Sequence, residues 1–259
     1  MQIDLTGRTA LVTGATRGIG RAVAEALAAA GAQVAVHGAR LRPEAEGFAQ
    51  ALRGVFLAAD LAQPGEAERL WRAALGALGR VDVLVCNAGV FEAAPLDAGD
   101  WGTRWARTIA INLDAPAALC RAACRHARAR RAAGEQPAVG EALVRVVTVS
   151  SRAAFRGDDP DYLAYAASKG GLVALTKSIA RGFGADGVAA FGVAPGFTET
   201  EMAAPFVAAH GRDAAAAGTA FGRMARPEDV APAVVFLASG LADQATGATL
   251  DVNGASYVR

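Results

Sequence analysis

The fold of this chain is decided near its start, by the stretch Arg8-Thr9-Ala10-Leu11-Val12-Thr13-Gly14-Ala15-Thr16-Arg17-Gly18-Ile19-Gly20. The residues from Arg8 to Thr13 form the apolar run of a short buried strand. Closely spaced glycines follow, and residues 21–30 have the composition of a helix. A strand, a glycine-rich turn and a helix in this order predict a nucleotide-binding unit.

Each glycine of the turn has a physical role. Gly14 permits the tight turn, Gly18 lets the backbone approach a pyrophosphate, and Gly20 allows the helix to pack closely on the strand. Backbone amides at the start of the helix then face the phosphates. We assign the following residues of the turn to cofactor binding: Gly14, Thr16, Arg17, Gly18, Ile19 and Gly20.

The composition is that of a globular protein, with 53% hydrophobic and 20% charged residues among 259. A net charge of +1 argues against broad nucleic-acid binding. No uncharged apolar stretch reaches the ~20 residues that span a bilayer. The first residues lack a basic segment followed by an apolar run. We therefore expect a cytoplasmic protein that binds neither nucleic acid nor membrane.

The three cysteines, Cys86, Cys120 and Cys124, are an odd number, which argues against a disulfide framework. Cys120 and Cys124 share a helix face, and His126 is close to them in sequence. A zinc site needs about four ligands, and the chain has no second cluster. We expect buried thiols and no metal site.

Strands alternate with helices along the whole chain, which predicts a parallel sheet. The expected strands are residues 8–13, 33–36, 55–59, 81–86, 143–149, 191–194 and 249–252. No linker or repeat divides the chain. We predict a single NAD(P)-binding domain over residues 1–259. Its fold class is α/β, a Rossmann-type doubly wound parallel sheet of about seven strands with helices on both faces.

The cofactor preference is set after the second strand, at His37-Gly38-Ala39-Arg40, where an adenosine ribose would arrive. An acidic residue there would bind the free 2′-hydroxyl of NAD, and none is present. Arg17 and Arg40 would instead attract a 2′-phosphate. Arg40 could also simply begin the next helix, so NADP(H) is favoured and NAD(H) remains possible.

Polar residues follow two other strands, at the edge of a parallel sheet where ligands bind. Asp60-Leu61 follows the third strand, and Asn87-Ala88-Gly89 follows the fourth. Turn chemistry is the alternative explanation for Asp60 and Asn87.

Tyr165 and Lys169 lie four positions apart in a predicted helix, residues 162–183, and so share a face about 6 Å apart along the axis. A neighbouring ammonium lowers the pKa of a phenol, which could then exchange a proton near neutral pH. Lys169 and Lys177 are the only lysines. An ordinary helix pair is the alternative, and Tyr162 is about 10 Å from Lys169 along the axis.

Three further segments carry expectations. Residues 100–131 form a long helical region that Asn112-Leu113-Asp114-Ala115-Pro116 should break, exposing the Asn112 side chain to water. An arginine-rich end of this region is either a solvated face or a dock for an acidic partner. Residues 200–221 are alanine-rich with few structural signals, and we predict a mobile substrate lid at about 197–222.

Together these motifs resemble the short-chain dehydrogenase/reductase superfamily, across nearly the whole chain. The matching positions are Thr13 to Gly20, Asp60-Leu61, Asn87-Ala88-Gly89, Asn112, Ser151, Tyr165, Lys169, Pro195-Gly196 and Thr200. The resemblance implies an enzyme that transfers a hydride between a nicotinamide and a ketone or secondary alcohol.

The resemblance also implies a role for each residue. Tyr165 would be the general acid/base, Lys169 would lower its pKa and bind the nicotinamide ribose, and Ser151 would steady the substrate oxygen. Asn112 would hold a proton-relaying water. Asp60 would bind the adenine, Asn87 would line the cofactor site, and Thr200 would meet the carboxamide. The other implied cofactor contacts are Leu61, Ala88, Gly89, Tyr165, Lys169, Pro195, Gly196 and Thr198.

The chain departs from the family pattern in three places. Ser151 lies about one residue farther from Tyr165 than usual, which keeps Ser150 as a lesser candidate. Phe191 stands where the family often has asparagine. The segment 128–141 is longer than usual.

We therefore predict an NADP(H)-dependent carbonyl reductase resembling 3-oxoacyl-carrier-protein reductases, with a free or carrier-bound substrate and a homotetrameric or dimeric assembly. The alternatives are an NAD-dependent secondary-alcohol dehydrogenase and a non-catalytic nucleotide sensor. Specificity should lie in residues 91–99, 152–162 and 197–222. There, Arg152 and Arg156 either hold an acidic substrate group or are solvated.

Overall fold

The computed structural model describes residues 3–135 and 141–259. Within them, seven parallel strands form one sheet in the order β3-β2-β1-β4-β5-β6-β7. The strands are β1 (Thr9–Val12), β2 (Gln33–Gly38), β3 (Val55–Ala58), β4 (Val83–Cys86), β5 (Val144–Val149), β6 (Val188–Pro195) and β7 (Thr249–Val252). The doubly wound parallel sheet predicted from the sequence is confirmed.

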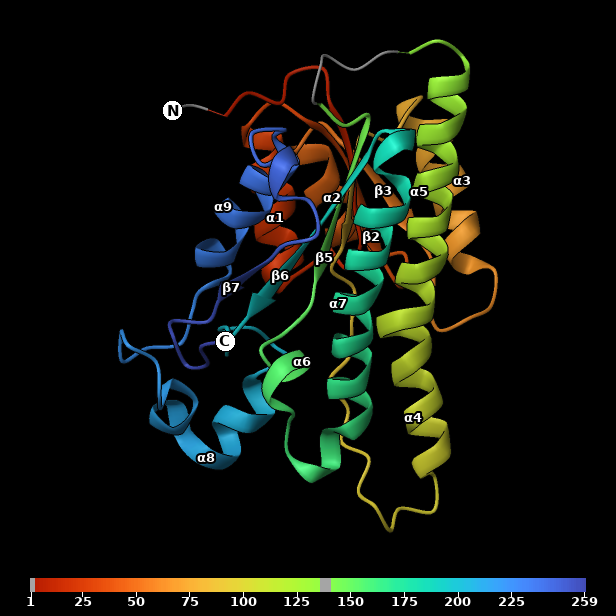
Figure 1. The fold of residues 1–259 in the computed structure, drawn as a ribbon. Helices are drawn as coiled ribbons and strands as arrows, with labels where there is room; N and C mark the ends of the chain where they lie inside the picture. Colours follow the sequence, from red (N-terminus) through yellow and green to blue (C-terminus); the bar gives the residue numbers. More distant parts are fainter. Residues whose placement is uncertain (1–2, 136–140) are drawn as a thin grey trace.

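Helices cover both faces of the sheet (Figure 1). One layer contains α1 (Gly18–Ala29), α2 (Pro43–Ala51) and α9 (Pro227–Ala238). The other contains α3 (Glu66–Leu78), α5 (Ala115–Ala132) and α7 (Leu163–Phe183). The remaining α-helices of the described chain are α4 (Trp101–Ile109), α6 (Ala153–Arg156) and α8 (Ala204–Ala216).

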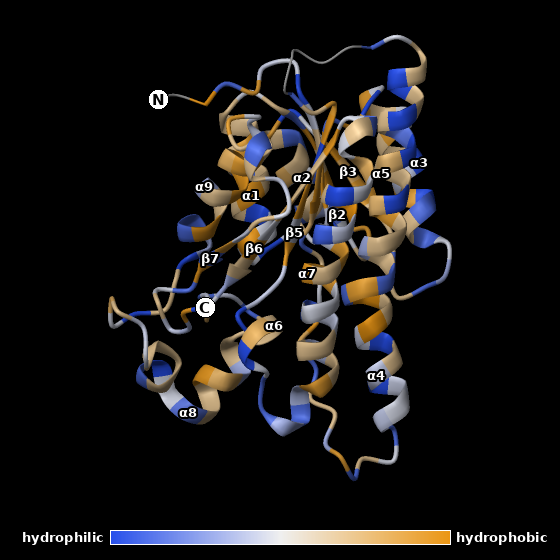
Figure 2. Ribbon diagram, in the orientation of Figure 1, coloured by the Kyte–Doolittle hydropathy of each residue, from blue (hydrophilic) through white to orange (hydrophobic). Residues whose placement is uncertain are grey.

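The core follows from strand alternation. Ala10 and Val12 of β1 pack toward the α1 layer, and Leu11 between them packs toward the α3 layer. Both faces are buried, which is why the strands are continuous apolar runs. Figure 2 shows apolar strands between helices whose polar residues face outward.

The sheet reverses its strand order between β1 and β4. The loops that leave these two strands diverge to opposite faces, which opens a crevice at their carboxyl ends. Gly14 follows β1 there, and Asn87 follows β4. The topology therefore brings together two motifs more than 70 residues apart.

The predicted helix break at Asn112 to Pro116 is wrong. A π-helical turn, Ala110–Asp114, joins α4 and α5 into one helical column (Figure 1). Pro116 directly follows this wider turn, which accommodates the proline inside a continuous helical column. Asn112 is fully buried, so its expected exposure to water is also wrong.

The segment expected to lack structural signals, residues 200–221, contains α8, with a kink at Gly211 (φ +83°). Its many alanines, which we took as uninformative, are strong helix formers. Whether the segment acts as a lid remains a prediction.

The arginine-rich end of α5 is mostly solvated. Arg121, Arg125, Arg128 and Arg131 are exposed, whereas Arg130 pairs with the buried Asp82 and with Glu135. Part of the long 128–141 segment, residues 136–140, lies outside the described residues, as do Met1 and Gln2.

The cysteines Cys86, Cys120 and Cys124 are buried free thiols, as expected. Among the described residues, no cluster of three or more histidine, cysteine or acidic side chains could hold a metal ion. None of the described helices is both long and apolar enough to cross a membrane.

Candidate active site

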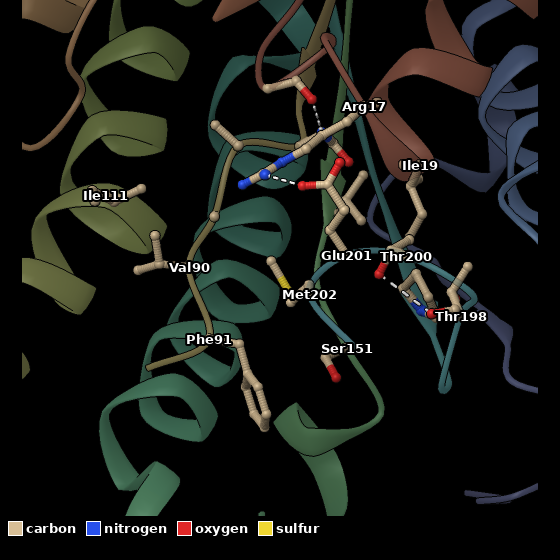
Figure 3. Close-up of a pocket in the computed structure, with 18 of the residues that line it drawn as sticks. Arg17, Ile19, Val90, Phe91, Ile111, Ser151, Thr198, Thr200, Glu201 and Met202 are labelled. Carbon is tan, nitrogen blue, oxygen red and sulfur yellow. Dashed lines mark hydrogen bonds and ion pairs between the residues drawn. The ribbon is translucent and has the colours of Figure 1, made fainter. Parts of the chain in front are cut away.

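A cavity of about 800 Å³ opens at the carboxyl ends of the strands (Figure 3). It is lined by every residue assigned to the site from the sequence except Asn112. The glycine-rich turn forms one end, and Ser151, Tyr165 and Lys169 lie toward the other. Three parts of the chain predicted to act together thus share one cavity.

The glycine-rich turn requires glycine for steric reasons. Gly14 has φ +63°, and a Cβ there would lie 2.8 Å from the Cα of Ala88. A Cβ on Gly20 would lie 2.2 Å from the carbonyl oxygen of Gly14. Gly18 also has positive φ (+54°), and a Cβ there would lie 3.0 Å from a side-chain atom of Thr200. The turn therefore packs against the loops after β4 and β6.

Asn87 braces this turn. Its Nδ2 donates to the carbonyl oxygens of Thr13 at 2.8 Å and Gly14 at 3.0 Å. The Thr13 hydroxyl accepts hydrogen bonds from the backbone N–H groups of Asn87 at 2.9 Å and Ala88 at 3.0 Å. Asn87 uses its amide to fix the turn, and it also lines the cavity. Its contact with a cofactor stays a prediction.

His37, which we did not select from the sequence, also fixes the turn. Its Nδ1 accepts from the N–H of Gly14 at 3.1 Å, and its Nε2 lies 2.9 Å from the carbonyl oxygen of Ala59. Burial lowers the pKa of His37 to about 4, so the ring is neutral at physiological pH. A buried histidine at a strand end was the available signal.

The start of α1 is free to bind an anion. In the described chain no side chain caps this end at Arg17, and no acidic residue lies in the first turn. Arg17 instead reaches Glu201 in an ion pair (Figure 3). Among residues 3–135 and 141–259, the guanidinium groups of Arg40 and Arg42 form no ion pair, and both line the cavity beside Gly38. Arg42 was not selected from the sequence.

Asp60 is exposed at the end of β3 and accepts a hydrogen bond from the N–H of Ala62 at 3.1 Å. The turn chemistry considered for it is therefore present, while Asp60 and the buried Leu61 both line the cavity.

Tyr165 and Lys169 share the inner face of α7. The Lys169 Nζ is buried, lies 5.6 Å from the centroid of the Tyr165 ring, and donates to the carbonyl oxygen of Val149 at 2.8 Å. Burial lowers the pKa of Lys169 to about 8. Burial raises the pKa of Tyr165 to about 12, against the hydrogen-bonding effect of Ser151.

The expected lowering of the Tyr165 pKa is therefore wrong for this structure, because desolvation of the buried phenol has a larger effect than the hydrogen bond with Ser151. Tyr165 is the neutral phenol at pH 7.

Ser150 and Ser151 have different surroundings. The buried Ser150 hydroxyl donates to the carbonyl oxygen of Lys169 at 2.9 Å and is committed to holding α7. The Ser151 hydroxyl faces Tyr165 and accepts from the N–H of Ala153 at 3.1 Å, which leaves its proton free to donate. The geometry favours Ser151 over Ser150.

Tyr162 and Tyr165 both pack against Phe91, but in different positions relative to the cavity. Tyr162 stacks on Phe91, with ring centroids 3.9 Å apart, and Phe91 meets Tyr165 edge to face at 4.8 Å. Phe91 and Tyr165 line the cavity, whereas Tyr162 does not.

Asn112 does not line the cavity but is hydrogen-bonded to Val90, which does. Its Oδ1 accepts from the N–H of Val90 at 2.8 Å, and its Nδ2 donates to the Val90 carbonyl oxygen at 2.9 Å. The Nδ2 also donates to the Ser168 hydroxyl at 3.2 Å. The amide thus ties the π-helical turn to the cavity-lining Val90 and to α7.

The loop after β6 also lines the cavity. Gly196 packs against Asn253, since a Cβ there would lie 3.0 Å from its Cα. The Thr198 hydroxyl donates to the Gly196 carbonyl at 3.1 Å, and the Thr200 hydroxyl donates to the Thr198 carbonyl at 3.3 Å. With Pro195, these residues line the cavity beside the glycine-rich turn, which packs on Thr200 at Gly18.

Comparison with known proteins agrees with this arrangement. A family model described as "Enoyl-(Acyl carrier protein) reductase" matches residues 14–255. The 3-oxoacyl-[acyl-carrier-protein] reductase of Vibrio cholerae is 35% identical over 258 residues, which are 99% of this chain and 100% of that protein. The cis-4-hydroxycyclohexanecarboxylate dehydrogenase of Sinomonas cyclohexanicum is 36% identical over 253 residues, 95% of each chain.

A crystal structure of a short-chain dehydrogenase from Burkholderia cenocepacia in complex with NADP superposes with a TM-score of 0.85 and 31% identity, covering 97% of this chain and 98% of that one. Fold and cavity thus define an oxidoreductase of the Rossmann class. The chain belongs to the short-chain dehydrogenase/reductase family.

Proposed function

We propose that this enzyme transfers a hydride between NADP(H) and a ketone or secondary alcohol, with 3-oxoacyl thioesters as the first candidate substrates. The observation that carries the proposal is that Ser151, Tyr165 and Lys169 line the same cavity as the glycine-rich turn. A proton donor for a carbonyl oxygen and a cradle for a dinucleotide thus share one space.

The residues present fit a nicotinamide dinucleotide. The uncapped start of α1 offers backbone amides to a pyrophosphate, and Gly20 lets the glycine-rich turn pack tightly against this end of the helix. At the adenosine end, Gly38 stands where an acidic residue would select NAD, and Arg40 and Arg42 offer charge to a 2′-phosphate. This favours NADP(H).

When bound, the cofactor supplies the hydride. Tyr165 gives its proton to the carbonyl oxygen during reduction, and its raised pKa keeps that proton in place at pH 7. The Ser151 hydroxyl donates a hydrogen bond to the same oxygen. Lys169 places a buried cation near the phenol, which favours the phenolate that reduction leaves behind. Asn112 positions the wall of the site through Val90.

At pH 7 Tyr165 is a neutral phenol and can act as the acid that reduction of a ketone requires. The Vibrio relative is named for reduction of a 3-oxoacyl carrier, which supports testing thioesters first. The Sinomonas relative is named for oxidation of a secondary alcohol, so an NAD-dependent alcohol dehydrogenase is the second candidate.

The lid and the assembly complete the proposal. Met202 and Ala203 line the cavity just before α8, so movement of residues 197–222 would change access to it. From the family resemblance we propose a homotetramer or homodimer, which light scattering coupled to size-exclusion chromatography would distinguish.

The test is a screen of ketones and acyl thioesters with NADPH and with NADH, followed by the loss of reduced-nicotinamide absorbance. The proposal expects turnover with at least one ketone and a lower KM for NADPH than for NADH. Strong preference for NADH would establish the second candidate. Tight cofactor binding without turnover of any ketone or alcohol would indicate a nucleotide sensor.

A further inference from the structure

Arg152 stands at the catalytic end of the cavity, directly after Ser151. Its backbone N–H donates to the carbonyl oxygen of Pro195 at 3.1 Å. Its guanidinium carbon lies 4.9 Å from the centroid of the Phe197 ring. The side chain is half-buried and lines the cavity. Its backbone is thus fixed where the walls formed after β5 and β6 meet.

A second cation lies beside it. Arg156, at the end of α6, lines the same cavity and is more exposed. Within residues 3–135 and 141–259, neither guanidinium group forms a hydrogen bond or an ion pair. Burial lowers the pKa of Arg152, and the charge of Arg156 lowers it further. The charged form of Arg152 is therefore destabilised by its surroundings. A half-buried cation in this position is stabilised by an opposing charge.

Among the described residues, no acidic side chain forms an ion pair with either arginine, although the charge of Asp158 partly offsets that of Arg152. Asp158 lines the cavity, yet it lies beyond ion-pair distance of either arginine, and burial raises the pKa of its carboxyl. Arg107, another cavity-lining arginine, is already paired with Glu92. Arg152 and Arg156 therefore differ from Arg107 in being available to a ligand.

We propose that the substrate carries a carboxylate, which Arg152 binds with Arg156 beside it, while the carbonyl or hydroxyl group of the same molecule meets Ser151 and Tyr165. The planar guanidinium suits a carboxylate because two parallel N–H donors match its two oxygens. This inference rests on the proposed hydride transfer to a ketone, and within it favours small oxo and hydroxy acids over the thioesters named first above. The Sinomonas relative is named for an alcohol that bears a carboxylate.

The test compares substrates that differ only in charge. 4-Oxocyclohexanecarboxylate, its carboxamide and a neutral 3-oxoacyl thioester of N-acetylcysteamine are each assayed with NADPH. For the wild type, kcat/KM should favour the acid over the amide by about 10- to 100-fold, the range of a charge-assisted hydrogen bond. Arg152→Gln should remove that preference by lowering kcat/KM for the acid, while kcat/KM for the amide stays within about twofold of the wild type. Arg152→Lys, which keeps the positive charge, should restore part of the preference.

Arg121→Gln is the matched control, because Arg121 is exposed on α5 outside the cavity. This variant should prefer the acid over the amide as strongly as the wild type does. The inference is overturned if the wild type uses acid and amide equally, if the neutral thioester is the best substrate, or if Arg152→Gln lowers both rates alike.

A binding measurement separates this inference from the proposed function. Calorimetric titration of the NADP⁺-saturated protein with 4-oxocyclohexanecarboxylate involves no turnover, because the oxidised cofactor has no hydride to give to the ketone. Binding that weakens at least tenfold in Arg152→Gln supports the anion site even if no ketone is reduced, in which case the proposed function fails alone. Absent or unchanged binding refutes the anion site, whatever the activity.

Discussion

The cavity is surrounded by two kinds of polar groups. The first kind, called the floor here, is the glycine-rich turn together with Thr13, His37, Asn87 and Asn112, whose side chains are all hydrogen-bonded to neighbouring backbone; of these four, His37 and Asn87 line the cavity. At the rims, within the part of the chain that the structure describes, the pair Arg40 and Arg42 and the pair Arg152 and Arg156 lack ion-pair partners.

The difference separates positioning from recognition. A buried polar group with all its partners in the protein holds one geometry and has little capacity left for a ligand. A rim cation without a partner gains most from a ligand's opposite charge. Changes to the floor should therefore disturb the whole site, whereas changes to the rims should alter single ligand preferences.

The largest effect is expected on the floor, from Gly20→Val. The new side chain would begin 2.2 Å from the Gly14 carbonyl oxygen, so the glycine-rich turn must move. NADPH affinity, measured by fluorescence titration, should fall by more than about 100-fold, which corresponds to a loss of about 3 kcal/mol of binding free energy. Gly102→Ala is the control, since a Cβ there meets no atom within 4 Å. Wild-type affinity in Gly20→Val would remove the steric argument.

An intermediate effect is expected at the adenosine rim. Replacing both Arg40 and Arg42 by glutamine should weaken NADPH binding by about 10- to 100-fold and leave NADH binding within about twofold. Arg72→Gln, an exposed change on α3, should affect neither cofactor. Equal losses for the two cofactors would mean that these arginines do not select the 2′-phosphate.

The smallest effect at neutral pH is expected from His37. Its pKa is about 4 in the folded protein and near 6.5 when unfolded, so the unfolded state binds more protons between these values. The stability that neutral His37 contributes is present above pH 6.5 and is lost as pH falls toward 4, by about 1–3 kcal/mol.

Thermal unfolding of wild type and His37→Gln from pH 7 to 4 measures this loss. The wild type should lose stability more steeply than the variant. Parallel curves would show that His37 is not the titrating group.

The sequence predicted the sheet, and all of the site residues that it assigned except Asn112 line the cavity, because glycine turns and strand ends are local signals. It did not predict the π-helical turn, since a proline after Asn112 usually marks a helix break, and here a wider turn accommodates the residue. His37 and Arg42 were missed because their roles depend on contacts and positions that only the folded sheet creates. The raised pKa of Tyr165 needed the burial of the phenol, which spacing alone cannot give.

The most direct test of the central claim is the turnover of Tyr165→Phe, with NADPH binding measured on the same protein. Removing one hydroxyl should lower kcat by about 10²- to 10⁴-fold, because the proton donor is lost. NADPH affinity should stay within about twofold, and Tyr162→Phe should remain active, since Tyr162 does not line the cavity. Wild-type turnover in Tyr165→Phe would contradict the account.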